Sequence, residues 1–298
     1  MIGFIGLGNM GSNMARCLMK HGKKLIVLDT NKSINEKFKA EGCEIAESPA
    51  DIAAASRHII TMLPRSEHVK EVFTGANGIL KNIQRGTVCM ECSTTDRHVV
   101  MNIAELVKKQ NAEFMDAPVF GGFDRAKDGT LTIMVGADSK QVYARGEEIL
   151  KLMSNKVVHV GKVGSGQGVN VCNNMLAGIQ MLACSEAMNL GMSMGLDSKA
   201  LADIIKSSTG YSFQSGEYNP VPGIVEGAPA SLGDKPGFAI NVMARDLAHS
   251  QNASTEVQAP TPLGSVAHQI VMILSQSPEY EQKDVSSIYQ SLKKAPGK

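Results

Sequence analysis

The sequence predicts a two-domain α/β protein, in which a doubly wound parallel sheet is followed by an all-α domain and the two are joined through a long helix. In the first half, short apolar runs alternate with segments of helical periodicity, the pattern of a parallel sheet covered by helices. After Gly161 this alternation stops, and residues 167–195 contain no proline and carry apolar residues at helical spacing. We therefore expect a first domain over residues 1–163 and a helical one over residues 164–298.

Each expected element follows from its local pattern. The expected strands are the apolar runs at residues 2–6, 25–29, 58–63, 87–92, 113–116, 131–136 and 157–160. Helical periodicity in the first domain covers residues 9–20, 33–40, 66–73 and 95–109. In the second domain it covers residues 167–195, 200–207, 238–253, 265–275 and 284–292. Pro220 and Pro222 make residues 217–223 a loop, because proline interrupts regular elements.

Charge balance, apolar run length and cysteine spacing indicate which partners the chain lacks. The chain of 298 residues has 30 Lys+Arg against 29 Asp+Glu, a net charge of +1, with no basic block longer than a pair. A nucleic-acid binder normally shows a basic excess or stripe, so we expect no nucleic-acid partner. No apolar run approaches the ~20 residues that span a bilayer, so we expect no membrane partner. The six cysteines form no zinc pattern, so we expect no metal.

A glycine-rich loop follows the first expected strand and opens the first expected helix. It reads Gly6-Leu7-Gly8-Asn9-Met10-Gly11, which in this context is the G-x-G-x-x-G fingerprint of a Rossmann-type dinucleotide site. The first glycine permits a tight turn, the second lets the backbone approach a pyrophosphate, and the third lets helix pack on strand. The helix N-terminus then binds the phosphate. We therefore expect these six residues to bind a dinucleotide.

The cofactor is predicted to be NAD. Asp29 ends the second expected strand, 18 residues past Gly11. A carboxylate at this place accepts hydrogen bonds from the ribose hydroxyls and repels a 2′-phosphate. Lys32 lies close in sequence, so strict exclusion of NADP stays open.

Loops at the carboxyl ends of parallel strands line the ligand crevice. Leu63 and Pro64 follow the third expected strand, and Thr94 follows the fourth. Thr94 can bind the cofactor, cap the helix that follows, or do both. The strand expected over residues 113–116 runs toward Pro118, and Phe120-Gly121-Gly122 follow shortly after it. Consecutive glycines expose backbone N–H groups that suit a carboxylate, although a plain turn is the alternative.

Together these motifs resemble those of the β-hydroxyacid dehydrogenase family, and within it the 3-hydroxyisobutyrate branch. The resemblance covers nearly the whole chain. Its cofactor signature lies in residues 4–15, its substrate motif in 116–122 and 129–132, and its catalytic helix in 164–167 and 172–175. Residues 186–191, 218–223 and 263–270 resemble the 3-hydroxyisobutyrate branch in particular.

The resemblance implies NAD-dependent oxidation of a small hydroxy acid, 3-hydroxyisobutyrate, to methylmalonate semialdehyde in valine catabolism. It implies that Asn174 binds the substrate beside residues 120–122, and that Arg245 lies near the cofactor. It also implies a homodimer or homotetramer. Through the animal enzymes it implies the mitochondrial matrix, although the chain shows no targeting segment and a cytoplasmic location is also open.

Three residues depart from the family pattern. The family's catalytic lysine, in Lys-x-x-Asn-Asn, is Asn170 here, and an amide cannot accept a proton at neutral pH. Phe120 replaces a usual serine, and Arg245 replaces a lysine with a group of different shape. We therefore expect weak activity. A catalytically inactive NAD-binding paralogue is the alternative, and a reductase of tartronate semialdehyde or glyoxylate fits residues 218–223 less well.

Overall fold

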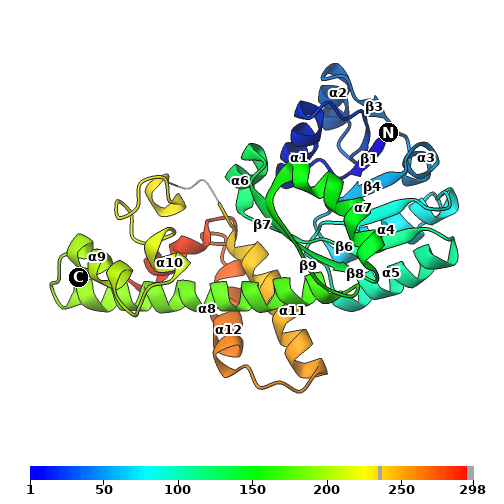
Figure 1. Ribbon diagram of the computed structural model, residues 1–298. Helices are drawn as coiled ribbons and strands as arrows, with labels where there is room; N and C mark the ends of the chain where they lie inside the picture. The colour runs from blue at the N-terminus through cyan, green and yellow to red at the C-terminus, as the bar shows by residue number, and fades with distance from the viewer. Residues whose placement is uncertain (234–236, 294–298) are drawn as a thin grey trace. The chain divides into compact units, whose positions relative to one another are not determined.

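The computed structural model describes residues 1–233 and 237–293 and divides into two compact units (Figure 1). The first covers Met1–Asn170, and the second begins at Val171. Strands and helices alternate in the first unit, whereas the described part of the second contains helices and no strand, so the predicted fold class is confirmed. Helix α8 (Ser165–Ser193) runs through both units, so no loop marks a boundary and the division at residue 163 stays a prediction.

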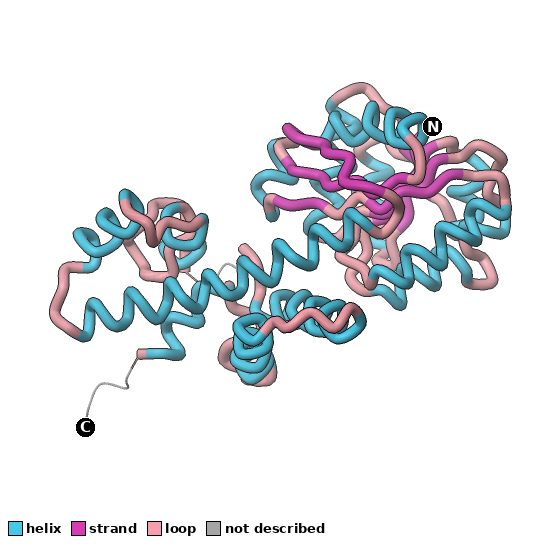
Figure 2. Tube along the Cα trace, turned by 60° about the horizontal axis from the view of Figure 1, so that its bottom comes forward, coloured by secondary structure: helices cyan, strands magenta, loops and turns pink. Residues whose placement is uncertain are grey.

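The first unit is built on one mixed sheet of nine strands, gathered together in Figure 2. Their order is β3-β2-β1-β4-β5-β6-β8-β7, with β9 paired to β8. The strands are β1 (Ile2–Ile5), β2 (Leu25–Leu28), β3 (Glu44–Ile45), β4 (His58–Thr61), β5 (Val88–Glu91), β6 (Glu113–Asp116), β7 (Val119–Phe120), β8 (Leu131–Ala137) and β9 (Ser154–Gly161).

The sheet is parallel from β3 to β6, as the sequence predicts, but β8 is antiparallel to both β6 and β7. Only residues 121–130 connect β7 to β8. A parallel crossover needs a dozen or more residues, so this short connection returns the chain antiparallel. The short strands β3 and β7 were not among the expected elements.

Seven helices cover this sheet. They are α1 (Asn9–Lys20), α2 (Lys32–Ala40), α3 (Pro49–Ala55), α4 (Ser66–Thr74), α5 (Arg97–Lys109), α6 (Gly122–Asp128) and α7 (Lys140–Leu150), of which α3, α6 and α7 were not expected. Consecutive strand residues belong to different cores: Phe4 packs in one apolar cluster and Ile5 in another. Because successive side chains of a strand point to opposite faces, the sheet is covered on both sides.

The second unit consists of helices. They are the later part of α8, α9 (Ser198–Ser207), α10 (Phe213–Gly216), α11 (Ile240–Glu256), α12 (Pro262–Ser275) and α13 (Ile288–Leu292). Helices α11 and α12 lie side by side (Figure 1). Met181, Met243 and Val271 bring α8, α11 and α12 into one buried apolar cluster. The predicted loop over residues 217–223 follows α10, as expected.

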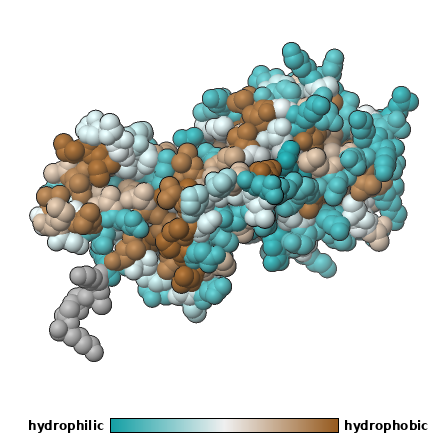
Figure 3. All heavy atoms as spheres, turned by 90° about the horizontal axis from the view of Figure 1, so that it is seen from below, coloured by the Kyte–Doolittle hydropathy of each residue, from teal (hydrophilic) through white to brown (hydrophobic). Residues whose placement is uncertain are grey.

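Several large apolar side chains of the second unit stay exposed, and Figure 3 shows apolar surface there. They include Leu190, Met194, Ile204, Leu263 and Ile273. Among the described residues, no helix combines the length and apolarity that crossing a bilayer requires.

Candidate active site

The three glycines of the first loop have different surroundings. Gly6 has φ +94°, and a Cβ there would strike the Met62 carbonyl. A Cβ at Gly11 would strike the Gly6 carbonyl, so α1 packs directly on the loop backbone. Gly8 has nothing within 4 Å of a Cβ position. Gly6 and Gly11 are thus required for packing, whereas Gly8 leaves open space in front of the backbone.

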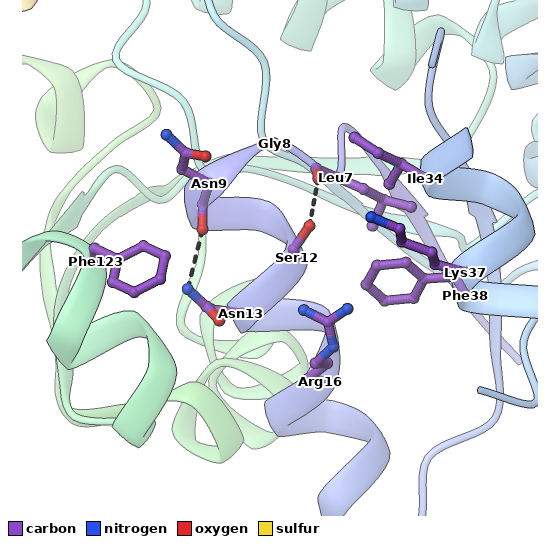
Figure 4. A pocket seen from close by; sticks show the side chains of 10 residues that line it. All are labelled: Leu7, Gly8, Asn9, Ser12, Asn13, Arg16, Ile34, Lys37, Phe38 and Phe123. Atoms are coloured by element: carbon purple, nitrogen blue, oxygen red, sulfur yellow. Dashed lines mark hydrogen bonds between the residues drawn. The ribbon is translucent and has the colours of Figure 1, made fainter. Parts of the chain in front are cut away.

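A pocket of about 290 Å³ opens at this loop (Figure 4). Leu7, Gly8 and Asn9 line it together with residues of α1, α2 and α6: Ser12, Asn13, Arg16, Ile34, Lys37, Phe38 and Phe123. Gly8 is the N-cap of α1 and supplies no side-chain acceptor to the first turn. The N–H groups of that turn therefore suit a phosphate, and two cationic side chains lie in the same pocket. These residues fit a dinucleotide cofactor.

Asp29 follows β2 and is held against the glycine loop. Its Oδ2 accepts a hydrogen bond from the Leu7 N–H at 2.7 Å, and its Oδ1 accepts one from the Asn31 N–H at 2.8 Å. The Asn35 amide fixes the Asp29 backbone, donating to its carbonyl at 2.8 Å and accepting from its N–H at 2.9 Å. Each carboxylate oxygen has a second acceptor site. The geometry is compatible with the predicted bonds to ribose hydroxyls.

The loops after β4 and β5 are joined by a hydrogen bond. The Leu63 N–H donates to Ser93 Oγ at 2.8 Å. Thr94 is half-buried, and its Oγ1 accepts a hydrogen bond from Asn170 Nδ2 at 3.3 Å. The alternative that Thr94 caps the following helix is wrong, because Asp96 is the N-cap of α5 and accepts from the N–H groups of its first turn.

Two buried carboxyl groups lie next to each other, at the ends of β5 and β6. Glu91 and Asp116 are register partners, and both side chains are fully buried. Asp116 holds the start of α8, accepting hydrogen bonds from the Gly164 N–H at 2.7 Å and the Gln167 N–H at 2.8 Å. Glu91 accepts from the Ser93 N–H at 3.0 Å and from Thr95 Oγ1 at 3.1 Å.

Burial shifts the titration of both groups upward. It raises the pKa of Glu91 to about 7 and that of Asp116 to about 6, although hydrogen bonds to both carboxylates oppose the shift. The folded protein therefore holds a proton on Glu91 that the unfolded chain releases between pH 4.5 and about pH 7. The stability that Glu91 contributes falls as pH rises through this window and is constant above it.

We expect Glu91→Gln to make the protein more stable than wild type at pH 8 and to have little effect at pH 5. The amide keeps an acceptor for the Ser93 N–H and carries no charge at any pH. The gain at pH 8 should be on the order of 3 kcal/mol or less. Urea unfolding at both pH values measures it, and an equal difference at pH 5 and pH 8 would contradict the raised pKa.

The Gly121-Gly122 pair turns the chain from β7 into α6. Both glycines have positive φ, +139° and +69°, which explains why this turn is built from glycine. Phe120 is half-buried and pairs with Thr132 across β7 and β8. A Cβ at Gly121 would strike the Arg125 side chain, whereas Gly122 has nothing within 4 Å of a Cβ position. The carboxylate site at this turn stays a prediction.

In the second unit, Asn174 is linked to an ion pair between the half-buried Arg245 and the buried Asp246. Its Nδ2 donates to Asp246 Oδ2 at 2.9 Å. The Arg245 guanidinium donates to Asp246 Oδ1 from Nε at 3.0 Å and from Nη2 at 2.8 Å. Burial raises the pKa of Asp246, and the adjacent guanidinium opposes that shift. Asp246 thus orients both residues that the sequence assigned to ligand binding.

The sequence assigned no role to three of these polar side chains, those of Gln167, Asn35 and Asp246, although Gln167 lies within the motif of residues 164–167. Each side chain is buried or nearly so and makes hydrogen bonds to a predicted site residue or to its neighbours. Their positions in the sequence could have indicated a role, because each lies within six residues of a predicted site residue. An amide or carboxylate so close to a predicted site is a candidate for holding it in place.

Comparisons with known proteins match this architecture. Residues 1–161 match the family model described as the NAD binding domain of 6-phosphogluconate dehydrogenase. Residues 164–292 match the model described as NAD-binding of NADP-dependent 3-hydroxyisobutyrate dehydrogenase. The mitochondrial 3-hydroxyisobutyrate dehydrogenase of Rattus norvegicus is 46% identical over 98% of this chain and 87% of its own length. The chain belongs to the 3-hydroxyisobutyrate dehydrogenase family.

Other members of the 3-hydroxyisobutyrate dehydrogenase family and its relatives are also similar. An NAD-dependent L-serine dehydrogenase of Pseudomonas aeruginosa is 37% identical over 96% of both chains. The solved structure of Mycobacterium tuberculosis 3-hydroxyisobutyrate dehydrogenase with L-serine is 31% identical, with a TM-score of 0.92 over 98% of this chain and 99% of that one. The chain is thus an oxidoreductase-family protein with NAD-binding domains, and the predicted cofactor is confirmed.

Proposed function

We propose that this protein oxidises 3-hydroxyisobutyrate to methylmalonate semialdehyde with NAD, as a step of valine catabolism, and that Asn170 makes the reaction slow. The near full-length similarity to the rat enzyme carries the substrate assignment. The second part rests on the sequence, which has the amide of Asn170 where the family has its proton-accepting lysine. The structure holds this amide by a hydrogen bond to Thr94.

The residues of the first unit bind the cofactor and hold the reacting groups. The loop from Gly6 to Gly11 binds the phosphates, Asp29 binds the adenosine ribose, and Leu63, Pro64 and Thr94 line the crevice. When bound, NAD supplies the hydride acceptor. Asn170 orients the substrate hydroxyl by hydrogen bonding and cannot remove its proton at neutral pH, so the proton passes to solvent water as the hydride is transferred.

Two further groups bind the substrate. The N–H groups of Gly121 and Gly122 bind its carboxylate, with Phe120 replacing a hydroxyl donor by an apolar ring. Asn174 has two N–H donors and a carbonyl, so it can hold Asp246 and a substrate at once. The resemblance supports Arg245 as a cofactor-binding residue, and Asp246 holds its guanidinium by hydrogen bonds from Nε and Nη2.

A substrate panel tests this function. Reduction of NAD is followed by absorbance with 3-hydroxyisobutyrate, L-serine, glycerate and glycolate. We expect the highest kcat/KM for 3-hydroxyisobutyrate, at a turnover about 10²–10⁴-fold below that of a relative that has the family's lysine at this position. A preference for L-serine would contradict the substrate, and a turnover equal to the relative's would contradict the effect of Asn170.

The second candidate is a binding protein that retains NAD without turnover. Its support is that the glycine loop and Asp29 are complete while the lysine position holds an amide bonded to Thr94. NADH affinity by fluorescence titration, combined with no turnover on any substrate of the panel, would favour it over the enzyme.

We also propose a homodimer or homotetramer in the mitochondrial matrix. The exposed apolar side chains of the second unit, such as Leu263 and Ile273, support self-association, since a monomer rarely leaves so many uncovered (Figure 3). The mitochondrial relatives support the compartment. Light scattering on a sizing column measures the oligomeric state. Cell fractionation with a matrix marker measures the compartment.

A further inference from the structure

The Gln167 side chain makes two hydrogen bonds to the backbone on either side of Thr94. It is fully buried in the first turn of α8. Its Nε2 donates to the Ser93 carbonyl at 2.8 Å, and its Oε1 accepts from the Thr95 N–H at 3.2 Å. One amide thus satisfies the donor and the acceptor that a neighbouring strand would otherwise pair.

Two further hydrogen bonds join the first turns of α8 to the ends of the strands beside this pair of Gln167 bonds, which we call the Gln167 clamp. The Gln167 N–H donates to Asp116 Oδ2, which fixes the start of α8 to the end of β6. Three residues later, about one helical turn, Asn170 Nδ2 donates to Thr94 Oγ1. Gln167 and Asn170 therefore hold Thr94 by its backbone and by its side chain. Within residues 91–95, Thr94 alone is only half-buried, whereas its four neighbours are buried.

We propose that Gln167 is a positioning residue that orients the Thr94 hydroxyl toward the bound cofactor. This inference rests on the proposed role of Thr94 in cofactor binding, and not on the identity of the oxidised substrate. Since Oγ1 accepts its hydrogen bond from Asn170, the Thr94 hydroxyl proton points elsewhere and can be donated to a ligand. Without the clamp, the loop of residues 93–95 loses the two bonds that set this direction.

A double-mutant cycle on NADH affinity tests the proposal. Gln167→Met removes both hydrogen bonds at nearly constant shape, and Thr94→Val removes the hydroxyl. NADH dissociation constants are measured by fluorescence titration for the wild type, both single variants and the double variant. Gln167→Asn repeats the cycle with an amide one methylene shorter, which cannot reach both backbone groups, in case the methionine variant does not fold.

We expect each single variant to raise the NADH dissociation constant about tenfold, and the double variant to show about tenfold as well. A positioning residue has nothing to orient once the hydroxyl is gone, so its effect vanishes in the Thr94→Val background. An increase of about a hundredfold in the double variant, or an unchanged constant for Gln167→Met, would overturn the proposal.

Asn219 provides the matched structural control. It is buried in the second unit, and its amide also clamps a loop, donating to the Ser215 carbonyl at 3.1 Å and accepting from the Val221 N–H at 3.0 Å. Asn219→Leu should lower the melting temperature as Gln167→Met does and leave the NADH constant unchanged. An equal loss of affinity in both would mean general destabilisation and would overturn the proposal. Because the readout is NADH binding, the experiment tests the role of Gln167 even if the protein does not oxidise 3-hydroxyisobutyrate.

Discussion

Asn170→Lys should raise the turnover of 3-hydroxyisobutyrate by about 10²–10⁴-fold, the usual contribution of general acid–base catalysis. Asn170 is buried, on the turn of α8 that follows the clamp by Gln167. Burial lowers the pKa of a lysine amine toward neutrality, so the new side chain can take the substrate's hydroxyl proton near pH 7. Initial rates of NADH formation under saturating cofactor measure the gain.

Asn170→Gln is the control for the length of the side chain. It extends the amide without adding a base, so it should bring no gain. The lysine variant should also acquire a rising limb in its pH–rate profile, which the glutamine variant lacks. A gain shared by both variants would mean that reach, and not proton transfer, limits the wild type.

If Asn170→Lys brings no gain in turnover, Phe120 is the second candidate cause of the weak activity. Phe120→Ser, added to Asn170→Lys, restores a hydroxyl donor beside the Gly121 and Gly122 N–H groups. One recovered hydrogen bond to a carboxylate should lower KM for 3-hydroxyisobutyrate about tenfold. An unchanged KM would leave the cause of weak activity outside these two positions.

The sequence predicted those parts of the site that depend on local pattern. The loop from Gly6 to Gly11 lies between strand and helix, and the glycine spacing follows from close contacts within that turn. The turn at Gly121 and Gly122 was predictable for the same reason, since both glycines have positive φ. The long helix was evident from its apolar spacing, and α8 covers Ser165–Ser193.

The remaining parts depend on contacts between residues far apart in the chain. Gln167 reaches Thr95 across 72 positions, and Asp116 reaches Gly164 across 48. No periodicity encodes such pairs, because they follow from how the strand ends meet the helix. The prediction of the N-cap of α5 failed for a different reason. Thr94 and Asp96 are both good cap residues, and only the backbone path selects Asp96.

Gly8→Ala and Gly11→Ala, the same substitution three residues apart, should separate binding from folding. A methyl group at Gly11 strikes the Gly6 carbonyl, a backbone atom that cannot turn away as a side chain would. We expect a loss of about 1–3 kcal/mol in the free energy of unfolding, with NADH affinity lost as the loop is displaced. Urea unfolding and fluorescence titration measure the two effects.

Gly8→Ala should leave stability within about 0.5 kcal/mol of the wild type, because its methyl group meets nothing within 4 Å and its φ of −66° suits any residue. That open space is where the backbone must approach the pyrophosphate, so the NADH dissociation constant should still rise at least about tenfold. A Gly8→Ala variant with wild-type affinity would contradict the placement of the phosphates at this loop. A Gly8→Ala variant as unstable as Gly11→Ala would show instead that the glycine serves the fold.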